Sequence, residues 1–205
     1  MPNWTVFDII YLILIVITFI IRIPHAKISR STKIIKAQVD LSERIGLLLS
    51  FLGGFFLPLF YLFTPLFSFA DYTVPQVTGW LGAIICLPAV WIFLISHRDL
   101  GRQWSPKLEL REEHKLITTG IYEYIRHPMY TSVFLTSLAQ LLLLGNWLVG
   151  PSYLVGFCIL YFSRIDREEK LMTEQFGAEY TAYKSRTSRL ISMAFLLNAL
   201  RLGTN

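Results

Sequence analysis

The sequence predicts an all-α integral membrane protein with about five transmembrane helices. Only 16% of its 205 residues are charged and 54% are hydrophobic, whereas an ordinary globular domain carries about a quarter charged residues. Three long stretches, 45–70, 72–96 and 128–163, contain no charged residue at all. The same composition excludes a disordered chain, because disordered segments are rich in charge and poor in aromatic residues.

The first three spans are predicted from the length of the apolar stretches. A helix needs about 20 apolar residues to cross a hydrocarbon core of roughly 30 Å, and the stretches 45–70 and 72–96 meet that length. The stretch from Trp4 to Ile21 is slightly shorter, but it begins with tryptophan, a typical interfacial residue. No basic segment precedes it and no small-residue cleavage site follows it, so we expect a span there and not a cleaved signal peptide.

The charge-free stretch 128–163 is too long for one helix and just long enough for two short ones. Its middle, residues 145–152, contains Gly, Asn and Pro, which are typical of a turn. We therefore expect a short helical hairpin over about 130–164, with helices near 130–144 and 151–164. The alternative is a single long, kinked helix.

The basic residues support the count of five spans. All nineteen Lys and Arg residues lie in three segments, with six in 22–44, six in 98–126 and seven in 164–201. Five spans bring these segments to one side of the membrane, as the positive-inside rule requires. We expect the amino terminus outside, and the carboxyl terminus and active site in the cytoplasm. The positive net charge is then explained by topology, and nucleic acid is not expected as a partner.

We expect one membrane domain, residues 1–205, made of three consecutive regions. Residues 1–97 would form the three N-terminal spans with a basic loop at 22–44. Residues 98–189 would form the cofactor-binding and catalytic region, and residues 190–205 a C-terminal interfacial segment, which is too short for a sixth span.

Polar residues that could perform chemistry flank the predicted hairpin on its cytoplasmic side. A helix of about 15 residues and a second one running back return the chain to its starting level. We therefore expect Arg126 and His127, just before the hairpin, to lie beside Arg164 and Glu168, just after it.

Arg164 and Glu168 are four residues apart and share one helix face, whereas Asp166 and Glu169 point elsewhere. A carboxylate can accept hydrogen bonds from an ammonium group and a guanidinium can hold a carboxylate, so the pair suits a zwitterionic ligand. The alternative is a salt bridge at the membrane edge with no further role.

Other kinds of site find no support in the sequence. His97 and His114 lack cysteine or carboxylate partners at metal-ligand spacing, so no metal is expected. Nucleotide-binding glycine motifs and the serine-hydrolase motif are absent. Cys86 and Cys158 both lie in apolar stretches, so no disulfide framework is indicated.

The order and spacing of several short motifs around the hairpin resemble the isoprenylcysteine carboxyl methyltransferase family, which is related to the phospholipid methyltransferases. Together these motifs cover about 98–189. They are Gly101-Arg102-x-Trp104-Ser105, His114-x-Leu116-Ile117-x-x-Gly120-x-Tyr122, Arg126-His127-Pro128-x-Tyr130, Arg164-x-x-x-Glu168-Glu169 and Phe176-Gly177-x-Glu179-Tyr180. The small size of the chain suggests a prokaryotic member.

The resemblance implies an S-adenosylmethionine-dependent carboxyl O-methyltransferase, with S-adenosylhomocysteine as product. It would form a methyl ester on a prenylcysteine-like, lipophilic acceptor that enters from the bilayer. Arg164 matches the position that contacts the acceptor, and Arg164 and Glu168 would be the catalytic residues. The residues implied for cofactor binding are His114, Lys115, Leu116, Ile117, Gly120, Tyr122, His127, Pro128, Met129, Tyr130 and Glu168.

Two alternatives remain open at the level of sequence. A phospholipid N-methyltransferase would need a general base to take a proton from the amine, with Glu168, Glu169 and His127 as candidates. A carboxylate acceptor is already ionised at neutral pH and needs no base. A non-catalytic membrane scaffold whose basic segments bind anionic lipid is the second alternative.

Overall fold

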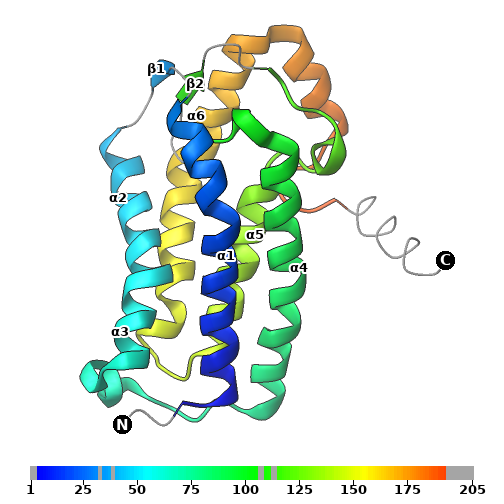
Figure 1. Ribbon diagram of the computed structural model, residues 1–205. Helices are drawn as coiled ribbons and strands as arrows, with labels where there is room; N and C mark the ends of the chain where they lie inside the picture. Colours follow the sequence, from blue (N-terminus) through cyan, green and yellow to red (C-terminus); the bar gives the residue numbers. More distant parts are fainter. Residues whose placement is uncertain (1–3, 32–33, 38–39, 106–108, 112–114, 193–205) are drawn as a thin grey trace, which may run out of the picture.

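The computed structural model describes residues 4–31, 34–37, 40–105, 109–111 and 115–192 and shows a bundle of helices side by side (Figure 1). The long helices are α1 (Val6–Ser31), α4 (Gln76–Leu100), α5 (Pro128–Leu143), α6 (Val149–Arg186), and a rod made of α2 (Leu41–Phe51), the π-helical η1 (Leu52–Phe56) and α3 (Leu57–Phe63). Short 3-10 turns are η2 (Pro65–Ala70), η3 (Gly101–Gln103) and η4 (Gly120–Glu123).

The predicted class, an all-α multi-pass membrane protein, is confirmed. Three helical segments are long and apolar enough to cross a membrane, Val6–Lys27, Leu41–Phe63 and Gln76–Leu100, and Pro128–Leu143 is a shorter apolar helix. The apolar first half of α6 packs beside α2 and α5. Large apolar side chains such as Phe162, 74% exposed, face outward and suit contact with lipid.

The segment 22–44 is predicted as a loop, and that prediction is wrong for its first part. Helix α1 continues to Ser31, because the residues after Ile21 include the good helix formers Arg22, Ala26 and Lys27. The next residues add an unpredicted antiparallel pair of strands, β1 (Ile34–Ala37) and β2 (Glu109–Arg111).

The hairpin predicted over 130–164 is present, and Asn146 holds its turn. The Asn146 side-chain oxygen accepts hydrogen bonds from the backbone N–H groups of Leu148 and Val149, both at 3.0 Å. Its amide nitrogen donates to Asp71 at 2.7 Å and to the Phe67 carbonyl at 2.8 Å. One side chain therefore joins the two loops at this end of the bundle.

The second helix of the hairpin does not end near residue 164, as predicted, but runs on to Arg186. Residues 164–176 are rich in Arg, Glu, Lys, Leu and Met, which all favour helix in water as well as in lipid. The helix breaks at Gly177, whose φ of 54° is easily reached only by glycine. Beyond this break, α6 folds over the end of the bundle (Figure 1).

Glycines bring α2 and α6 into direct backbone contact. A Cβ atom at Gly46 would lie 2.8 Å from Leu160 Cα, and one at Gly156 would lie 2.7 Å from the Leu49 carbonyl carbon. Small residues allow such close helix packing in membrane proteins. The close approach places Glu43, in the first turn of α2, against α6.

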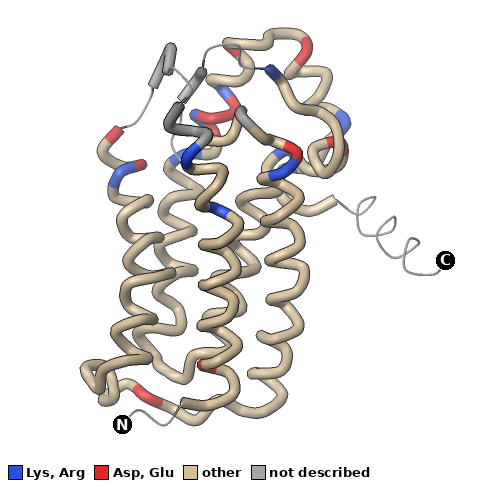
Figure 2. The backbone as a smooth tube through the Cα atoms, viewed as in Figure 1, with Lys and Arg blue, Asp and Glu red and all other residues tan. Residues whose placement is uncertain are grey.

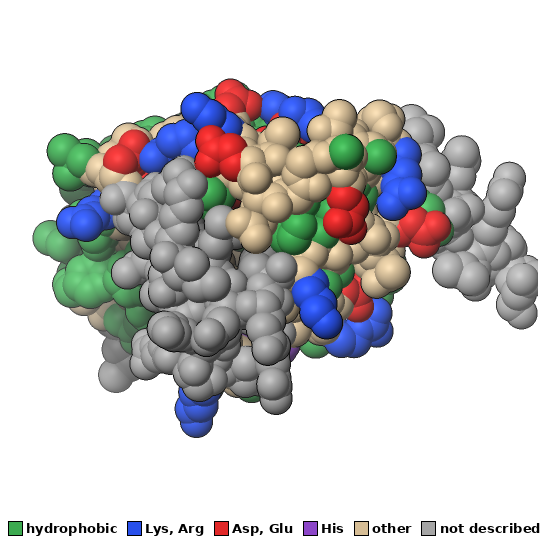
Figure 3. Space-filling view, turned by 90° about the horizontal axis from the view of Figure 1, so that it is seen from above, with side chains coloured by type: hydrophobic (Ala, Val, Ile, Leu, Met, Phe, Trp, Pro, Cys, Tyr) green, Lys and Arg blue, Asp and Glu red, His purple; other side chains and the backbone are tan. Residues whose placement is uncertain are grey.

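Charged residues gather at one end of the bundle. Among the residues that the structure describes, Figure 2 shows Lys and Arg only toward the end where β1, β2 and the last part of α6 lie, and Figure 3 shows acidic and basic side chains together on that face. This distribution agrees with the sorting of basic residues in the sequence. The predicted interfacial segment 190–205 lies outside the described residues beyond Ser192, and the division of the chain at residues 97 and 189 remains a prediction.

Candidate active site

A cavity of about 530 Å³ opens between the helices near the charged end of the bundle. Its walls come from α1, the α2–η1 rod, α5 and α6, with the 115–122 segment and Trp104 on one side. One part of the wall is apolar, with residues such as Ile15, Phe51 and Phe157, whereas another part carries Arg164 and Glu168. The cavity therefore offers an apolar and a charged region to one ligand or to two adjoining ones.

Arg164 is held between two carboxylates. Its Nε lies 3.1 Å from Glu168 Oε2, one helical turn away, and its Nη1 lies 3.3 Å from Glu43 Oε1 on α2. Glu43 is completely buried, with an exposed fraction of 0%. Because removing one member of a buried ion pair leaves an uncompensated charge, Glu43 and Arg164 fix each other's position.

Glu168 lies between Arg164 and the start of α5. Its side chain lines the cavity and is 24% exposed. The Tyr130 hydroxyl donates a 2.7 Å hydrogen bond to Glu168 Oε2, and His127 Nδ1 lies 3.6 Å from Glu168 Oε1. Burial alone would raise the pKa of the Glu168 carboxyl, but Arg164, His127 and Tyr130 hold it well below its ordinary value. Glu168 is therefore an anion that faces the cavity.

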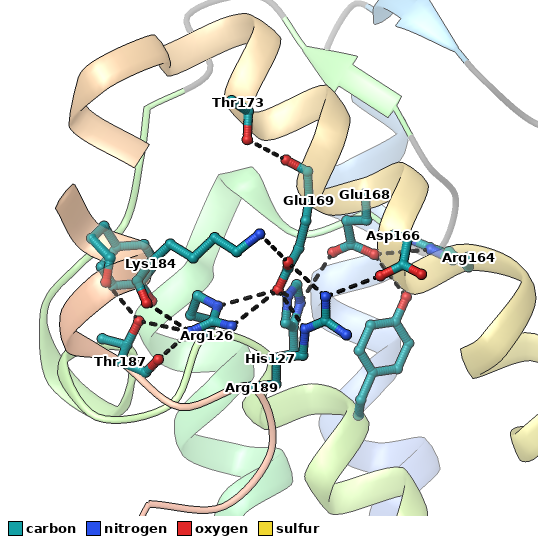
Figure 4. A network of polar contacts seen from close by, with 12 residues as sticks. Arg126, His127, Arg164, Asp166, Glu168, Glu169, Thr173, Lys184, Thr187 and Arg189 are labelled. Atoms are coloured by element: carbon teal, nitrogen blue, oxygen red, sulfur yellow. Dashed lines mark hydrogen bonds and ion pairs between the residues drawn. The ribbon is translucent and has the colours of Figure 1, made fainter. Parts of the chain in front are cut away.

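Glu169 does not line the cavity, and its side chain contacts a cluster of cations (Figure 4). Arg126 donates to Glu169 Oε1 from Nε and Nη2, both at 3.2 Å. Arg189 donates from Nε to Glu169 Oε1 at 3.1 Å and from Nη2 to Glu169 Oε2 at 3.0 Å. Lys184 Nζ lies 2.8 Å from Glu169 Oε2. This cluster fastens the segment that follows α6 to the start of α5.

His127 lies between the two carboxylates, with Nε2 3.4 Å from Glu169 Oε1. Burial alone lowers the pKa of His127, but the contacts with Glu168 and Glu169 outweigh it and raise the pKa above the ordinary value of 6.5. The imidazolium form is thus stabilised by folding.

We expect His127→Asn to cost more stability at pH 5.5 than at pH 9. A raised histidine pKa contributes stability that is fully present below 6.5 and is lost as the pH rises through the folded-state pKa. The two glutamates stay ionised at both pH values, because their pKa values are lowered. The measurement is the melting temperature of wild type and variant in detergent at each pH. The loss caused by the substitution should be larger at pH 5.5, by about 2–4 °C for each kcal/mol that the charged pairing contributes. An equal loss at both pH values would contradict a protonated His127.

The segment 115–122 is placed by a turn at Gly120. Gly120 has a φ of 65°, and a Cβ atom there would clash with the Asp99 carboxylate, which accepts a 3.0 Å hydrogen bond from the Ile121 N–H. The Tyr183 hydroxyl donates a 2.7 Å hydrogen bond to the Tyr122 carbonyl, which connects the segment to the end of α6. These contacts bring the segment to the edge of the cavity.

The structure brings together most of the residues that the sequence singles out. Those that line the cavity are Lys115, Leu116, Ile117, Tyr122, His127, Met129, Tyr130, Arg164 and Glu168. Gly120 and Pro128 do not line it; Gly120 shapes the turn and Pro128 starts α5. His114 lies outside the described residues. Their roles in binding remain proposals.

Sequence reasoning missed Glu43 as a partner of Arg164. The two residues are 121 positions apart, and only the packing of α2 on α6 joins them. One signal was available, since an acidic residue at the start of a long apolar stretch is costly without a partner. Among the described residues, no group of three or more His, Cys, Asp or Glu side chains could hold a metal ion.

Fold and site together define a multi-pass membrane protein with a charged pocket at one end of its helices. Residues 80–174 match the model of the isoprenylcysteine carboxyl methyltransferase family. In this region the chain is similar to that family, and the resemblance predicted from its motifs is confirmed.

Several relatives carry the name protein-S-isoprenylcysteine O-methyltransferase, and three of them illustrate the similarity. The protein from Dictyostelium discoideum is 31% identical over 111 residues, 51% of this chain and 45% of that protein. The Saccharomyces cerevisiae protein is 29% identical over 128 residues, 62% of this chain and 54% of that protein. The Homo sapiens protein is 35% identical over 78 residues, 38% of this chain and 28% of that protein. The chain thus spans about half the length of the first two relatives.

Proposed function

We propose that the protein is an S-adenosylmethionine-dependent carboxyl O-methyltransferase that esterifies a prenylcysteine-like, lipophilic acid. The observation that carries this proposal is the cavity itself, in which an ionised, cavity-facing Glu168 adjoins an apolar wall between membrane helices. The family match and the names of the relatives support the same reaction.

The residues present fit the cofactor. Its amino-acid part needs an anion for the ammonium group and a cation for the carboxylate, and Glu168 and Lys115 both line the cavity. Tyr122 and Tyr130 also line it and offer aromatic faces, which attract a sulfonium cation. When bound, S-adenosylmethionine would supply the methyl group. The carboxylate oxygen of the acceptor would form the new bond to this methyl carbon, and the electron pair of the broken carbon–sulfur bond would stay on sulfur.

The protein's contribution is binding, orientation and exclusion of water. The acceptor carboxylate is ionised at neutral pH, so no proton has to be removed. Arg164 lines the cavity and can donate hydrogen bonds toward the acceptor while Glu43 and Glu168 hold it in place. Apolar walls strip water from the carboxylate and strengthen these contacts.

The charges argue against an amine acceptor, which would require a base. Glu168 and Glu169 both have pKa values well below the ordinary value, because cations and hydrogen bonds outweigh the effect of burial. Carboxylates stabilised in this way are weak bases. His127 lies between them and has a raised pKa, which favours its protonated form.

Orientation belongs to the same proposal. The end of the bundle that carries the Lys and Arg side chains would face the cytoplasm, as the positive-inside rule implies. A water-soluble cofactor could then reach the cavity from that side, and the acceptor could reach it from the bilayer.

Binding of S-adenosylhomocysteine to the purified protein in detergent tests the proposal against a lipid-binding scaffold. Isothermal titration calorimetry should show saturable binding with one site per chain. A scaffold predicts no binding, and its absence in a folded preparation would contradict both methyltransferase hypotheses.

A further inference from the structure

The charged groups of the cavity are unevenly matched. Of the described residues that line it, five carry a formal charge: Arg22, Lys115, Arg126, Arg164 and Glu168. Arg126 and Arg164 each lie at ion-pair distance from a carboxylate described above. Within the described part of the chain, no Asp or Glu lies at ion-pair distance from Arg22 or Lys115. Among the described residues, two of the cations that line the cavity therefore have no carboxylate partner.

The proposed reaction brings two carboxylates into this cavity, one from the amino-acid part of the cofactor and one from the acceptor. Lys115 belongs to the segment that the family resemblance assigns to the cofactor. Arg22 comes from α1, outside the region 80–174 that matches the family. If Lys115 pairs with the carboxylate of the cofactor, Arg22 is the cation left to pair with the carboxylate of the acceptor.

Helix α1 has two distinct faces, and Arg22 lies on the one that faces the cavity. Residues three, four or seven positions apart share a helix face. The outward face carries exposed apolar residues at that spacing, Ile9, Ile13, Val16 and Ile20. The cavity face carries Tyr11, Ile15, Thr18 and Arg22. Arg22 is therefore the charged end of a mostly apolar wall that extends about 16 Å along the helix axis to Tyr11.

Trp104 fixes the position of the Arg22 side chain. The Arg22 guanidinium carbon lies 5.4 Å from the centre of the Trp104 ring. Trp104 is itself buried and packs against His97, with ring centres 5.0 Å apart. A guanidinium over an aromatic face keeps its N–H donors at its edge, where they can bind a carboxylate in a two-pronged manner.

We infer that Arg22 binds the carboxylate of the lipophilic acceptor, whose apolar chain lies along the α1 face toward Tyr11. This inference rests on the proposed function and adds an acceptor-binding residue from α1. Arg164 also lines the cavity, but its positive charge is already matched by Glu43 and Glu168. Arg22 supplies the charge that makes the site select an acid over a neutral ligand.

The test compares binding of an S-farnesylcysteine-type carboxylic acid with binding of its uncharged amide, by competition in detergent. The wild-type protein should prefer the acid by about tenfold or more, as a charge-assisted hydrogen bond predicts. Arg22→Gln should abolish this preference and keep its affinity for S-adenosylhomocysteine within about twofold, which also shows that the variant is folded. Arg22→Lys should retain part of the preference. Arg44→Gln, on the exposed side of α2, is the matched control and should behave as wild type.

Each remaining outcome contradicts a distinct claim. If Arg22→Gln still prefers the acid, Arg22 does not bind the acceptor. If it instead loses affinity for S-adenosylhomocysteine while Arg22→Lys keeps it, Arg22 holds the cofactor carboxylate and the inference fails. If the wild-type protein binds neither S-adenosylhomocysteine nor the acid, the proposed function itself fails, and the inference fails with it.

Discussion

Replacing Glu169 with glutamine is expected to cost about 3–5 kcal/mol of folding stability, the range for breaking a buried ion pair. Glu169 is 2% exposed and is contacted by Arg126, Lys184, Arg189 and His127. Loss of its charge leaves four cationic groups without their shared anion. At about 2–4 °C for each kcal/mol, the melting temperature in detergent should fall by well over 5 °C.

Asp166→Asn is the matched control for this prediction. Asp166 contacts the same Arg189 at 3.0 Å, but its side chain is 79% exposed. An exposed pair contributes about 0–1 kcal/mol, so the control should melt close to wild type. Equal losses in the two variants would show that the cluster around Glu169 does not anchor the end of α6.

Glu168→Gln is expected to weaken S-adenosylhomocysteine binding by roughly ten- to hundredfold. The substitution keeps the shape of the side chain but removes the anion that faces the cavity, and a hydrogen bond to a charged group contributes about 1.5–3 kcal/mol. Tyr130 and Arg164 can still donate to the amide oxygen, so the variant should remain folded. Isothermal titration calorimetry measures the affinity directly.

Glu123→Gln controls for the change of a nearby acid, since Glu123 is exposed on η4 and does not line the cavity. Its affinity for S-adenosylhomocysteine should match that of wild type. A folded Glu168→Gln protein whose affinity also stays within about twofold of wild type would remove Glu168 from the cofactor site.

Local patterns in the sequence were sufficient to predict the spans and the hairpin. Charge-free stretches mark membrane helices, and the Gly, Asn and Pro residues at 145–152 mark the turn that Asn146 closes. Because the hairpin returns the chain to one level, the sequence also predicted that His127 and Glu168 would meet, and they do, with 3.6 Å between Nδ1 and Oε1.

Contacts that depend on packing between distant segments could not be predicted in this way. The pair of Glu43 with Arg164 arises only because Gly46 and Gly156 let α2 approach α6. Arg22 seemed part of a basic loop until α1 was found to continue past it. Arg22 lines the cavity, and Glu43 contacts the cavity residue Arg164, because of helix orientation, which the hydropathy of a single stretch does not specify.

The most direct test of the central claim is transfer of a radiolabelled methyl group from S-adenosylmethionine by the purified protein. An S-farnesylcysteine analogue and phosphatidylethanolamine are offered separately as acceptors. We predict label on the thioether acid, released as methanol by mild base, as a methyl ester requires. Base-stable label found only on the lipid amine would contradict a carboxyl methyltransferase.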